Sequence, residues 1–591
     1  MLYYTVSPNP NKHQWEICLT LRQEKALSLE FSLPNWVPGS YLIRDFSRHI
    51  IEINAWCNDR QTSLIQTSKN TWKTPPLAGE WRICYTVYAF DLSVRGAFLT
   101  TERGFFDGAC LFLKASGFEH FPHQVSLQNL PHGWEVATTL PRIVSDTHHN
   151  FQAASYAELI DHPVETGNIE ILHFSANNIP HRIALSGHYA DFDRTRFIDD
   201  IRKICQAELA MFPEPAPFEE YLFLLHVGDN IYGGLEHISS TALLADRNCL
   251  PLHNTPDNDE NYVQLLGLCS HEYFHAWNVK SVKPEAFAPY NLDQECYTEQ
   301  LWAFEGITSY YDDLFLVRSG VITPETYLNL LAKNLTRVQQ GKGRLKQTLA
   351  ESSFTAWNKY YKQNENSPNS IVSYYQKGAL AALCLDLIIR EKSNGLFSLD
   401  TVMQQHYRDW QATRKGIPEK QWQQRCQEIT GLDLNEFFQT ALYSTHDLPL
   451  TQCLSYAGID LQWHALTRSH GGAYVCRIEP QNSAGDFGAR FKQNSDGITL
   501  SHVFHDGSAE RAGLCTNDKI IALNRFACTD FTAQWSKLNI GDTVHIHFFR
   551  DGVLHETELT IQAAEADTAL LQTENPDKLA DWLFNRNIQT A

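Results

Sequence analysis

The sequence lacks several features that would assign it to a particular class of protein. It contains no run of about 18 or more apolar residues, which a membrane-spanning helix needs. It also has no Cys-x-x-Cys pair, no tandem repeat and no low-complexity tract. Its 14 cysteines are scattered singly, so we expect them to be reduced and to pack as small hydrophobic side chains, without a disulfide framework or a second metal site.

Positive charge is also scarce. The chain has 48 basic and 68 acidic residues and a formal net charge of −20. It shows no Lys and Arg clusters of the kind that bind nucleic acid or anionic membranes, so we expect neither as a partner. Residues 1–8 lack the basic flank and continuous apolar stretch of a signal peptide, which predicts a cytoplasmic protein.

The hydrophobic pattern changes along the 591 residues, which are too many for one core. Residues 81–89 alternate between apolar and polar in the manner of a strand, and residues 197–210 have the period of an amphipathic helix. We therefore predict a multidomain α+β protein. Its predicted parts are an N-terminal β-sandwich-like domain at 1–170, a mixed domain at 171–450 with a helical part at about 320–450, a small β-rich domain at 466–563, and a tail at 564–591.

Residues 271–275 read His-Glu-Tyr-Phe-His, a pattern that can hold a zinc ion on one helix. Apolar residues recur at helical spacing through 261–270, so we expect the motif to be helical. Positions i and i+4 face the same way, which lets His271 and His275 bind one metal ion while Glu272 takes a proton from its bound water. Zinc lowers the pKa of such a water to about 7.

A catalytic zinc needs a third protein ligand, and two carboxylates compete for this role. Glu295 has a usual separation from His275, but it lies in a polar stretch, 291–300, that looks like the start of a helix. Glu305 lies among aromatic and apolar residues, where a charge needs a partner or a metal, so this environment favours it. Cys269 would point away from the histidine face of a helix, which disfavours it as a ligand.

The chain resembles the M61 glycyl aminopeptidases over nearly its whole length. Residues 271–280 are similar to the metal helix of that family, and residues 302–311 to the helix that carries its glutamate ligand. This implies Glu305 as the third ligand of one zinc ion. Residues 36–45 and 88–95 resemble the amino-terminal domain of the family. The resemblance also implies that the mixed middle domain is a thermolysin-like zinc peptidase.

One segment acquires a substrate-binding role from this resemblance. Residues 232–237 read Tyr-Gly-Gly-Leu-Glu-His and look like the strand that holds an extended peptide in related enzymes. Gly233 and Gly234 would offer backbone groups to the peptide. Glu236 would receive its free α-amino group, since an ammonium that enters a partly desolvated cleft needs an opposite charge.

A second segment, 373–383, is similar to the Tyr-x-Lys-Gly element of thermolysin-like aminopeptidases. This similarity implies that Tyr375 stabilises the oxyanion of the reaction, with Tyr374 as the adjacent alternative. A phenol stays protonated at neutral pH and donates one hydrogen bond, which suits that role.

Residues 497–504, 507–514 and 517–524 are followed by a hairpin around Asp551 and Gly552. This order resembles a PDZ domain, a module that usually binds a peptide as an added strand. Its carboxylate-binding loop would lie near 486–491, where the acidic Asp486 is not a clear match. A purely structural role for this domain is the alternative.

The predicted protein is a zinc aminopeptidase of the gluzincin type. Its partners would be peptide substrates with a free N-terminus and a peptide ligand of the PDZ-like domain. The resemblance implies a preference for small N-terminal residues such as Gly or Ala. The alternatives are a zinc endopeptidase that uses the same site, and a PDZ-dependent peptide-binding protein with weak or no turnover.

Overall fold

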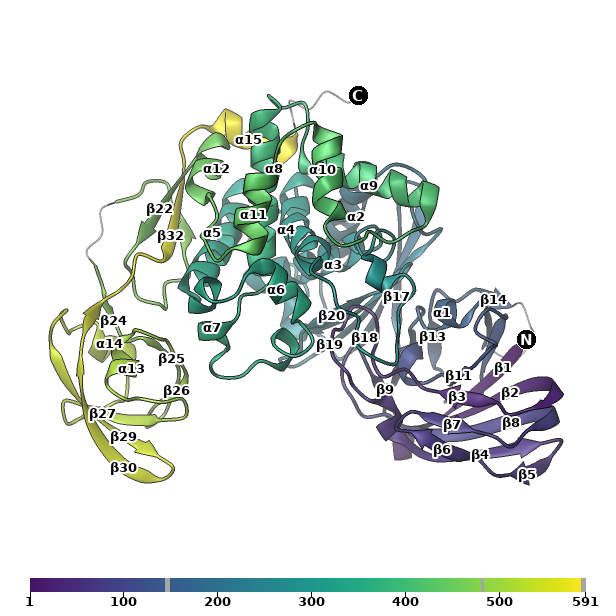
Figure 1. Cartoon of the computed structure of the whole chain (residues 1–591). Helices are drawn as coiled ribbons and strands as arrows, with labels where there is room; N and C mark the ends of the chain where they lie inside the picture. Colours follow the sequence, from purple (N-terminus) through teal and green to yellow (C-terminus); the bar gives the residue numbers. More distant parts are fainter. Residues whose placement is uncertain (144–148, 480–482, 586–591) are drawn as a thin grey trace. The chain divides into compact units, whose positions relative to one another are not determined.

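The computed structural model describes residues 1–143, 149–479 and 483–585, and the chain forms two compact units. Unit 1 comprises Met1–Cys296, Ser319–Val321 and His406–Ile417. Unit 2 comprises Tyr297–Arg318, Ile322–Gln405 and Pro418–Ala591. Both units are therefore discontinuous in sequence. Figure 1 shows the chain coloured by residue number.

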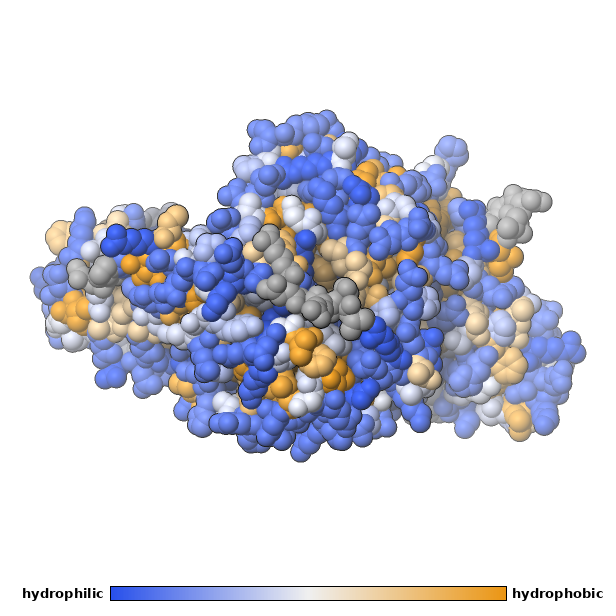
Figure 2. Space-filling model, turned by 90° about the horizontal axis from the view of Figure 1, so that it is seen from above, coloured by the Kyte–Doolittle hydropathy of each residue, from blue (hydrophilic) through white to orange (hydrophobic). Residues whose placement is uncertain are grey.

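Polar side chains cover most of the molecular face in Figure 2. Hydrophobic residues occur there in small groups between hydrophilic ones. Among the residues that the structure describes, no helix is long and apolar enough to cross a membrane. This agrees with the absence of long apolar runs in the sequence.

Sheets make up the first part of unit 1. In β8 the buried Trp81, Ile83 and Tyr85 alternate with side chains on the outer face, as the sequence pattern predicts. Trp15 of β2 packs on Phe106 of β10 with ring centroids 5.2 Å apart, so two sheets share one core. The strands are, in sheet order, β14 (Arg142–Ile143), β15 (His149–Ala153), β12 (His123–Leu127), β1 (Leu2–Asn9), β2 (Gln14–Leu27), β8 (Leu77–Tyr88), β4 (Ile50–Cys57) and β5 (Arg60–Thr62); β13 (Glu135–Ala137), β16 (Val164–Gly167), β10 (Arg103–Phe106) and β9 (Ala97–Leu99); and β11 (Lys114–Ala115), β3 (Glu30–Ser32), β7 (Thr71–Lys73) and β6 (Ile65–Ser68).

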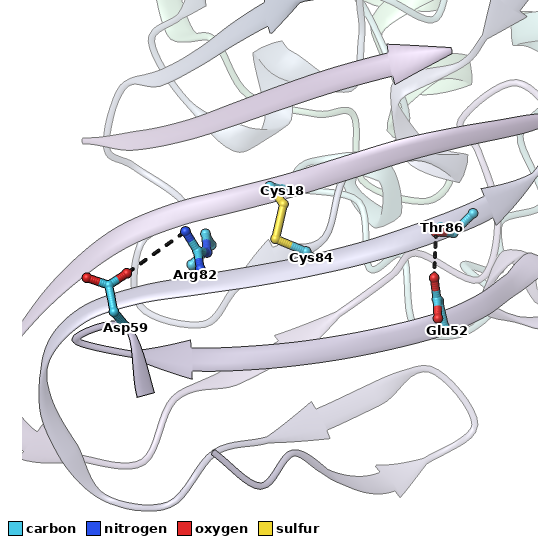
Figure 3. Close-up of a disulfide and its surroundings, with 6 residues drawn as sticks. All are labelled: Cys18, Glu52, Asp59, Arg82, Cys84 and Thr86. Atoms are coloured by element: carbon cyan, nitrogen blue, oxygen red, sulfur yellow. Dashed lines mark hydrogen bonds and ion pairs between the residues drawn. A yellow bond between two sulfur atoms is a disulfide. The ribbon is translucent and has the colours of Figure 1, made fainter. Parts of the chain in front are cut away.

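A disulfide joins Cys18 of β2 to Cys84 of β8 (Figure 3). The prediction that all cysteines are reduced is therefore wrong for this pair. The two residues are 66 positions apart in sequence, but the antiparallel register places them directly opposite each other, with their Cα atoms 4.1 Å apart. The other 12 cysteines are free, as predicted, and all but Cys476 and Cys515 are buried.

A five-stranded sheet follows in unit 1. Parallel strands β18, β19 and β21 form its centre, and β20 pairs with β21 in the antiparallel direction at one end of the strand order. Helix α3 packs against β20 and β21, and α2 packs against α3. The elements are β17 (Glu170–Ala176), β18 (Ile179–Gly187), β19 (Tyr221–Gly228), β21 (Ser240–Asp246), β20 (Gly233–Glu236), α1 (Tyr156–Leu159), α2 (Arg194–Met211) and α3 (Glu260–Phe274).

Helices dominate the first part of unit 2. A π-helical turn at Trp302–Gly306 runs into α4 (Ile307–Arg318), and α4, α5 and α8 lie side by side (Figure 1). The polar stretch 291–300, in contrast, contains no helix, so the helix start expected there is wrong; helical structure begins only where the apolar residues do. The other helices are α5 (Pro324–Gln340), α6 (Leu349–Phe354), α7 (Ser367–Ser370), α8 (Gln376–Lys392), α9 (Leu399–Thr413), α10 (Gln421–Thr430), α11 (Asn435–Tyr443), α12 (Leu450–Tyr456) and α15 (Pro576–Phe584).

The last part of unit 2 is a small sheet domain with its own core. Strand β25 is at one end of the strand order, and the turn between β29 and β30 contains Asp551 and Gly552. The elements are β25 (Ala489–Asn494), β26 (Gly497–Val503), β27 (Lys519–Leu523), β28 (Phe526–Ala527), β29 (Thr543–Arg550), β30 (Val553–Thr560), α13 (Ser508–Arg511) and α14 (Phe531–Trp535); β24 (Gly485–Asp486) pairs with β31 (Gln562–Ala563), and β22 (Ile459–His464) and β23 (Ala473–Tyr474) flank β32 (Thr568–Thr573).

Candidate active site

Helix α3 presents the two histidines of the motif. Its first turn is capped by the side chain of Asp259, which accepts a hydrogen bond from the backbone N–H of Tyr262 at 3.0 Å. Buried polar contacts then attach the helix to α2: the Tyr262 hydroxyl donates to Asp200 at 2.8 Å and the Ser270 hydroxyl to Glu208 at 2.9 Å. The helix is thus anchored on one face while its last turn carries the motif.

His271 and His275 lie as the spacing predicts. His271 is within α3, and His275 is the residue that follows its last turn, still in helical conformation. Their Nε2 atoms are 3.1 Å apart. The Nδ1 atom of His275 lies 2.8 Å from the carbonyl oxygen of Asn278, so this nitrogen carries the proton and Nε2 offers its lone pair. Two nitrogens bound to one tetrahedral zinc at about 2.0–2.1 Å lie about 3.3 Å apart, so the pair fits a shared metal.

Glu272 lies between α3 and strand β20. Its carboxylate occupies the space over Gly234, where an ideal Cβ would come within 2.0 Å of Oε1. Its backbone carbonyl accepts a hydrogen bond from the Tyr221 hydroxyl at 3.2 Å. The side chain is 5% exposed, so the carboxylate is in a partly dehydrated environment.

Glu236 ends β20 and belongs to the same cluster. One carboxylate oxygen each of Glu236 and Glu272 and one ring nitrogen of His275 all lie within 4.8 Å of one another, and all three residues are buried. Gly39, in the loop that follows β3, packs against the cluster: its φ is +89°, and an ideal Cβ there would lie 2.4 Å from Oε2 of Glu236. Among the described residues, Oε1 of Glu236 has no hydrogen-bond partner. This oxygen is therefore available to a ligand.

Strand β20 offers its outer edge to the same cluster. No strand of the described residues pairs with that edge, and Gly233 and Gly234 are only partly buried. The Arg95 guanidinium donates to the carbonyl oxygen of Gly234 at 2.9 Å, which holds this part of the strand in place. An extended peptide can pair with such an edge.

Glu305 lies in unit 2, in the π-helical turn Trp302–Gly306, and is 2% exposed. Wide helical turns of this kind occur often at functional sites. The next residue, Gly306, faces Gly378 of α8, with 2.6 Å between an ideal Cβ at 306 and the Gly378 Cα. Glu305 is also close enough to Tyr374 to contribute, after burial itself, to the raised pKa of that phenol.

Tyr375 directly precedes α8 in the same unit, at a position where its side chain makes no capping hydrogen bond. Its hydroxyl lies 3.5 Å from that of Tyr361, and its ring packs beside Tyr360 and Tyr374. Tyr375 is partly exposed, whereas Tyr374 is fully buried. Of the two predicted tyrosines, Tyr375 is therefore the one that a substrate can reach.

The two rejected ligand candidates differ from the residues above. Glu295 lies in an irregular segment and is partly exposed. Cys269 is buried in α3, and burial raises the pKa of its thiol, which disfavours the thiolate that zinc needs. Neither belongs to a metal-ligating cluster among the described residues.

A buried charge network beside Glu236 was missed by the reasoning from sequence. Asp161 lies 3.1 Å from Nδ1 of His237 and 2.7 Å from Nζ of Lys280, and Asp107 lies 3.7 Å from Nε2 of His237. Burial raises the pKa of Asp107 to about 6; burial acts in the same sense on Asp161, but Lys280 and His237 outweigh it and lower that pKa. The position of His237 directly after Glu236 was the one local signal.

In the small sheet domain, aromatic residues fill the space between β25 and α14. Phe531 of α14 packs on Phe487 and Phe491, and its ring centroid lies 4.7 Å from that of each. The acidic Asp486 of the expected carboxylate loop is 9% exposed, and its Oδ1 lies 3.5 Å from Nε of Arg468. Its charge is therefore offset within the domain.

Comparison with known proteins gives three matches to family models. Residues 3–168 match the peptidase M61 N-terminal domain, residues 264–381 match M61 glycyl aminopeptidase, and residues 472–540 match the PDZ domain. A solved structure described as an aminopeptidase N family protein from Idiomarina loihiensis is 40% identical, covers 99% of this chain and 100% of its own, and superposes with a TM-score of 0.94. No curated protein matches.

Two more distant structures are also similar. An M1 zinc metallopeptidase from Deinococcus radiodurans is 14% identical and covers 76% of this chain and 94% of its own, with a TM-score of 0.47. A yeast LTA4 hydrolase in complex with bestatin is 13% identical and covers 76% of this chain and 68% of its own, with a TM-score of 0.47. At these values the two similarities carry no argument about this chain.

Proposed function

Because this chain belongs to the M61 glycyl aminopeptidase family, we propose that it removes residues from the N-termini of peptides with the help of one zinc ion. The family, the fold class and the metallopeptidase class predicted from the sequence are confirmed by the matches above. The roles of individual residues, which follow, are part of this proposal.

The donor set suits zinc. His271 and His275 supply two nitrogens at a separation close to that of two zinc ligands. The hydrogen bond from Nδ1 of His275 to the Asn278 carbonyl oxygen orients the His275 ring. Glu305 is the proposed third ligand, since it is buried in a π-helical turn within the segment that matches the M61 glycyl aminopeptidase model. Bound zinc would polarise the scissile carbonyl and activate a water molecule as the nucleophile.

Glu272 is the proposed general base and acid. It takes a proton from the attacking water and passes this proton to the leaving nitrogen. Its position over Gly234 supports this role, because the carboxylate then lies beside the strand edge where the peptide would be bound. Low exposure reduces competition from bulk water.

Glu236 is the proposed receptor of the α-amino group. Its buried Oε1 has no hydrogen-bond partner among the described residues, and an ammonium group would supply one together with an opposite charge. Gly233 and Gly234 would pair with the peptide backbone, since no strand of the described residues pairs with this edge of β20. An anchored amine limits cleavage to the first peptide bond.

Tyr375 is the proposed donor to the oxyanion. Its partial exposure at the start of α8 supports the role, and its loss would cost about 3 kcal/mol of transition-state stabilisation, as for other oxyanion donors. The preference for Gly or Ala, peptide binding by the PDZ domain and a cytoplasmic location belong to the same proposal. The disulfide argues against the cytoplasmic location, because disulfides persist mainly in oxidising compartments.

The close grouping of Glu236, Glu272 and His275 carries this proposal. The test is mass spectrometry of a short Ala-initiated peptide, free or N-acetylated, after incubation with the zinc-loaded protein. Stepwise loss of residues from the free peptide alone is the expected result. Internal cleavage of both peptides would instead indicate an endopeptidase, and metal binding without any cleavage would indicate a peptide-binding protein.

A further inference from the structure

A cavity of about 860 Å³ lies within unit 1, beside the cluster of Glu236. It is lined by the segment that follows α3, by residues between Pro34 and Asp161, and by the last residues of α9 with the loop that follows them. Basic side chains gather on its wall more than acidic ones do. The charged residues of the lining are Lys114, Lys280, Lys283, Arg414 and Lys415, with Glu119, Asp161 and Asp293 as the acids.

Two of these lysines are already paired. Lys280 lies 2.7 Å from Asp161, and Lys114 lies 3.5 Å from Asp293. Lys283 is different: among the described residues, no carboxylate is within ion-pair distance of its Nζ, which lies 5.1 Å from the ring centroid of Tyr290. The cavity wall therefore carries a cation that has no ion-pair partner among the residues that the structure describes.

Backbone contacts hold Lys283 in place, and its side chain is largely removed from solvent. The backbone N–H of Ile417 donates to its carbonyl oxygen at 2.8 Å, and the adjacent Pro284 forms a β-bridge with Ile417. Burial, and then the nearby charge of Lys280, lower the pKa of Lys283 to about 8, while Asp161 and Glu236 act in the opposite sense. An ammonium in such surroundings is stabilised by an anion that enters from outside.

The cavity begins next to the proposed amine site. His237, which follows Glu236 in sequence, lines it, and so does Pro38, which precedes Gly39. Gly39 is in turn the residue that packs on the Glu236 carboxylate. A peptide spans at most about 3.3–3.6 Å per residue, so groups one to three residues from a bound α-amine can reach the cavity.

We propose that this cavity binds a carboxylate group of the peptide substrate, with Lys283 as its charge partner. The inference rests on the proposed function and adds to it a substrate class, peptides that carry a negative charge close to their N-terminus. Two sources of the carboxylate share this chemistry. One is the side chain of an Asp or Glu at the second position of the peptide, and the other is the free C-terminus of a short peptide.

Peptide binding to the zinc-loaded Glu272→Gln protein, measured by isothermal titration calorimetry, tests the proposal. The peptides are Ala-Ala-Ala with a free or amidated C-terminus, and amidated Ala-Glu-Ala and Ala-Gln-Ala. We expect the peptide with the matching carboxylate to bind about 10- to 100-fold more tightly than its neutral counterpart, as for other charge-assisted contacts. A difference within the first pair identifies the C-terminus, and one within the second pair identifies the side chain.

Variants at position 283 assign the effect to its residue. In a Lys283→Met background the two members of each pair should bind equally, while Lys283→Arg should restore the discrimination. Lys12→Met, at an exposed lysine of the same unit, should leave it unchanged. If neither carboxylate improves binding, or if Lys283→Met keeps the discrimination, the proposal is wrong.

The proposed function is checked separately. Hydrolysis of the neutral, amidated Ala-Ala-Ala by the wild-type protein shows that the aminopeptidase activity stands, whatever the cavity binds. A wild-type protein that hydrolyses none of the peptides would overturn the proposed function, and with it the assignment of this carboxylate to a substrate.

Discussion

Gly234 leaves the space that the carboxylate of Glu272 occupies: an ideal Cβ on this glycine would lie 2.0 Å from Oε1 and 2.5 Å from Cδ. The strand edge and the proposed general base are thus in direct contact. A side chain at 234 and the observed position of Glu272 exclude each other.

We therefore expect Gly234→Ala to lower kcat by about 100-fold or more, the usual contribution of a positioned general base. Zinc content should stay near that of the wild type, because His271 and His275 are not displaced. Kinetics on an Ala-initiated peptide and metal analysis of the same sample measure both. Gly471→Ala is the control, since the nearest atom to its added Cβ is 4.0 Å away. Wild-type kcat in Gly234→Ala would show that Glu272 need not stay where it is.

Separate roles for base and ligand predict that two inactive variants differ in zinc content. Glu272→Gln keeps the shape of the side chain but removes its basic carboxylate, so we expect it to bind zinc and to lose at least about 100-fold in kcat. His271→Ala should lose both zinc and activity. Inductively coupled plasma mass spectrometry gives the metal content and peptide assays give kcat. Near-normal turnover by Glu272→Gln would exclude it as the general base.

Gly306 and Gly378 allow the turn that carries Glu305 to approach α8. A Cβ at 306 would lie 2.6 Å from the Cα of Gly378 and 2.8 Å from the carbonyl oxygen of Tyr374, and these backbone atoms cannot rotate away. Gly306→Ala should therefore destabilise the protein by about 1–3 kcal/mol and weaken zinc binding through Glu305. Urea denaturation, with and without zinc, measures the two effects. Gly471→Ala is again the control, and equal zinc affinity in both variants would contradict the ligand role.

The raised pKa of the buried Asp107 carboxyl group makes the stability of the protein depend on pH. Burial raises its pKa from 3.8 to about 6, against the opposing effect of His237. Between about pH 4 and 6 the folded state then binds more protons than the unfolded state, so this carboxyl group makes stability fall as the pH rises through that range. The full loss above pH 6 is about 2–3 kcal/mol.

Asp107→Asn should remove this loss. An asparagine retains the Oδ1 that accepts the backbone N–H of Ala109 at 2.7 Å, but it carries no charge. Urea unfolding at pH 4, 5, 6 and 7 should show a steeper fall for the wild type than for the variant. Asp59→Asn, at an exposed aspartate, should follow the wild type. Parallel curves for the wild type and Asp107→Asn would mean that the buried carboxyl group is paired well enough to stay ionised.

The Cys18–Cys84 disulfide can be tested by counting free thiols. Alkylation of the denatured protein should modify 12 thiols before reduction and all 14 after it. Replacement of both cysteines by serine should lower the free energy of unfolding by about 2–4 kcal/mol, because the bond restricts the unfolded chain. Fourteen reactive thiols before reduction would show that the strands hold the pair together without a covalent bond.

Local patterns in the sequence predicted those parts of the site that depend on local structure. The spacing of His271 and His275 gave a shared face because helical geometry relates residues four positions apart. The proximity of Glu272 to Gly234, the packing of Gly39 on Glu236 and the opposition of Cys18 and Cys84 depend instead on strand register and on contacts between distant segments. No periodicity within one segment contains that information. The cavity around Lys283 was missed for the same reason.

Unit 1 is completed by a segment that is synthesised late. Trp410, Arg414 and Gly416 line the cavity, and Ile417 holds the backbone of Lys283, yet more than a hundred residues of unit 2 separate this segment from Cys296. A ribosome releases the chain from its N-terminus onward. The nascent protein can therefore form α3 and strand β20 early, but its cavity wall stays open until residue 417 has emerged. A nascent chain arrested before that point would hold the His-Glu-x-x-His motif beside an incomplete cavity.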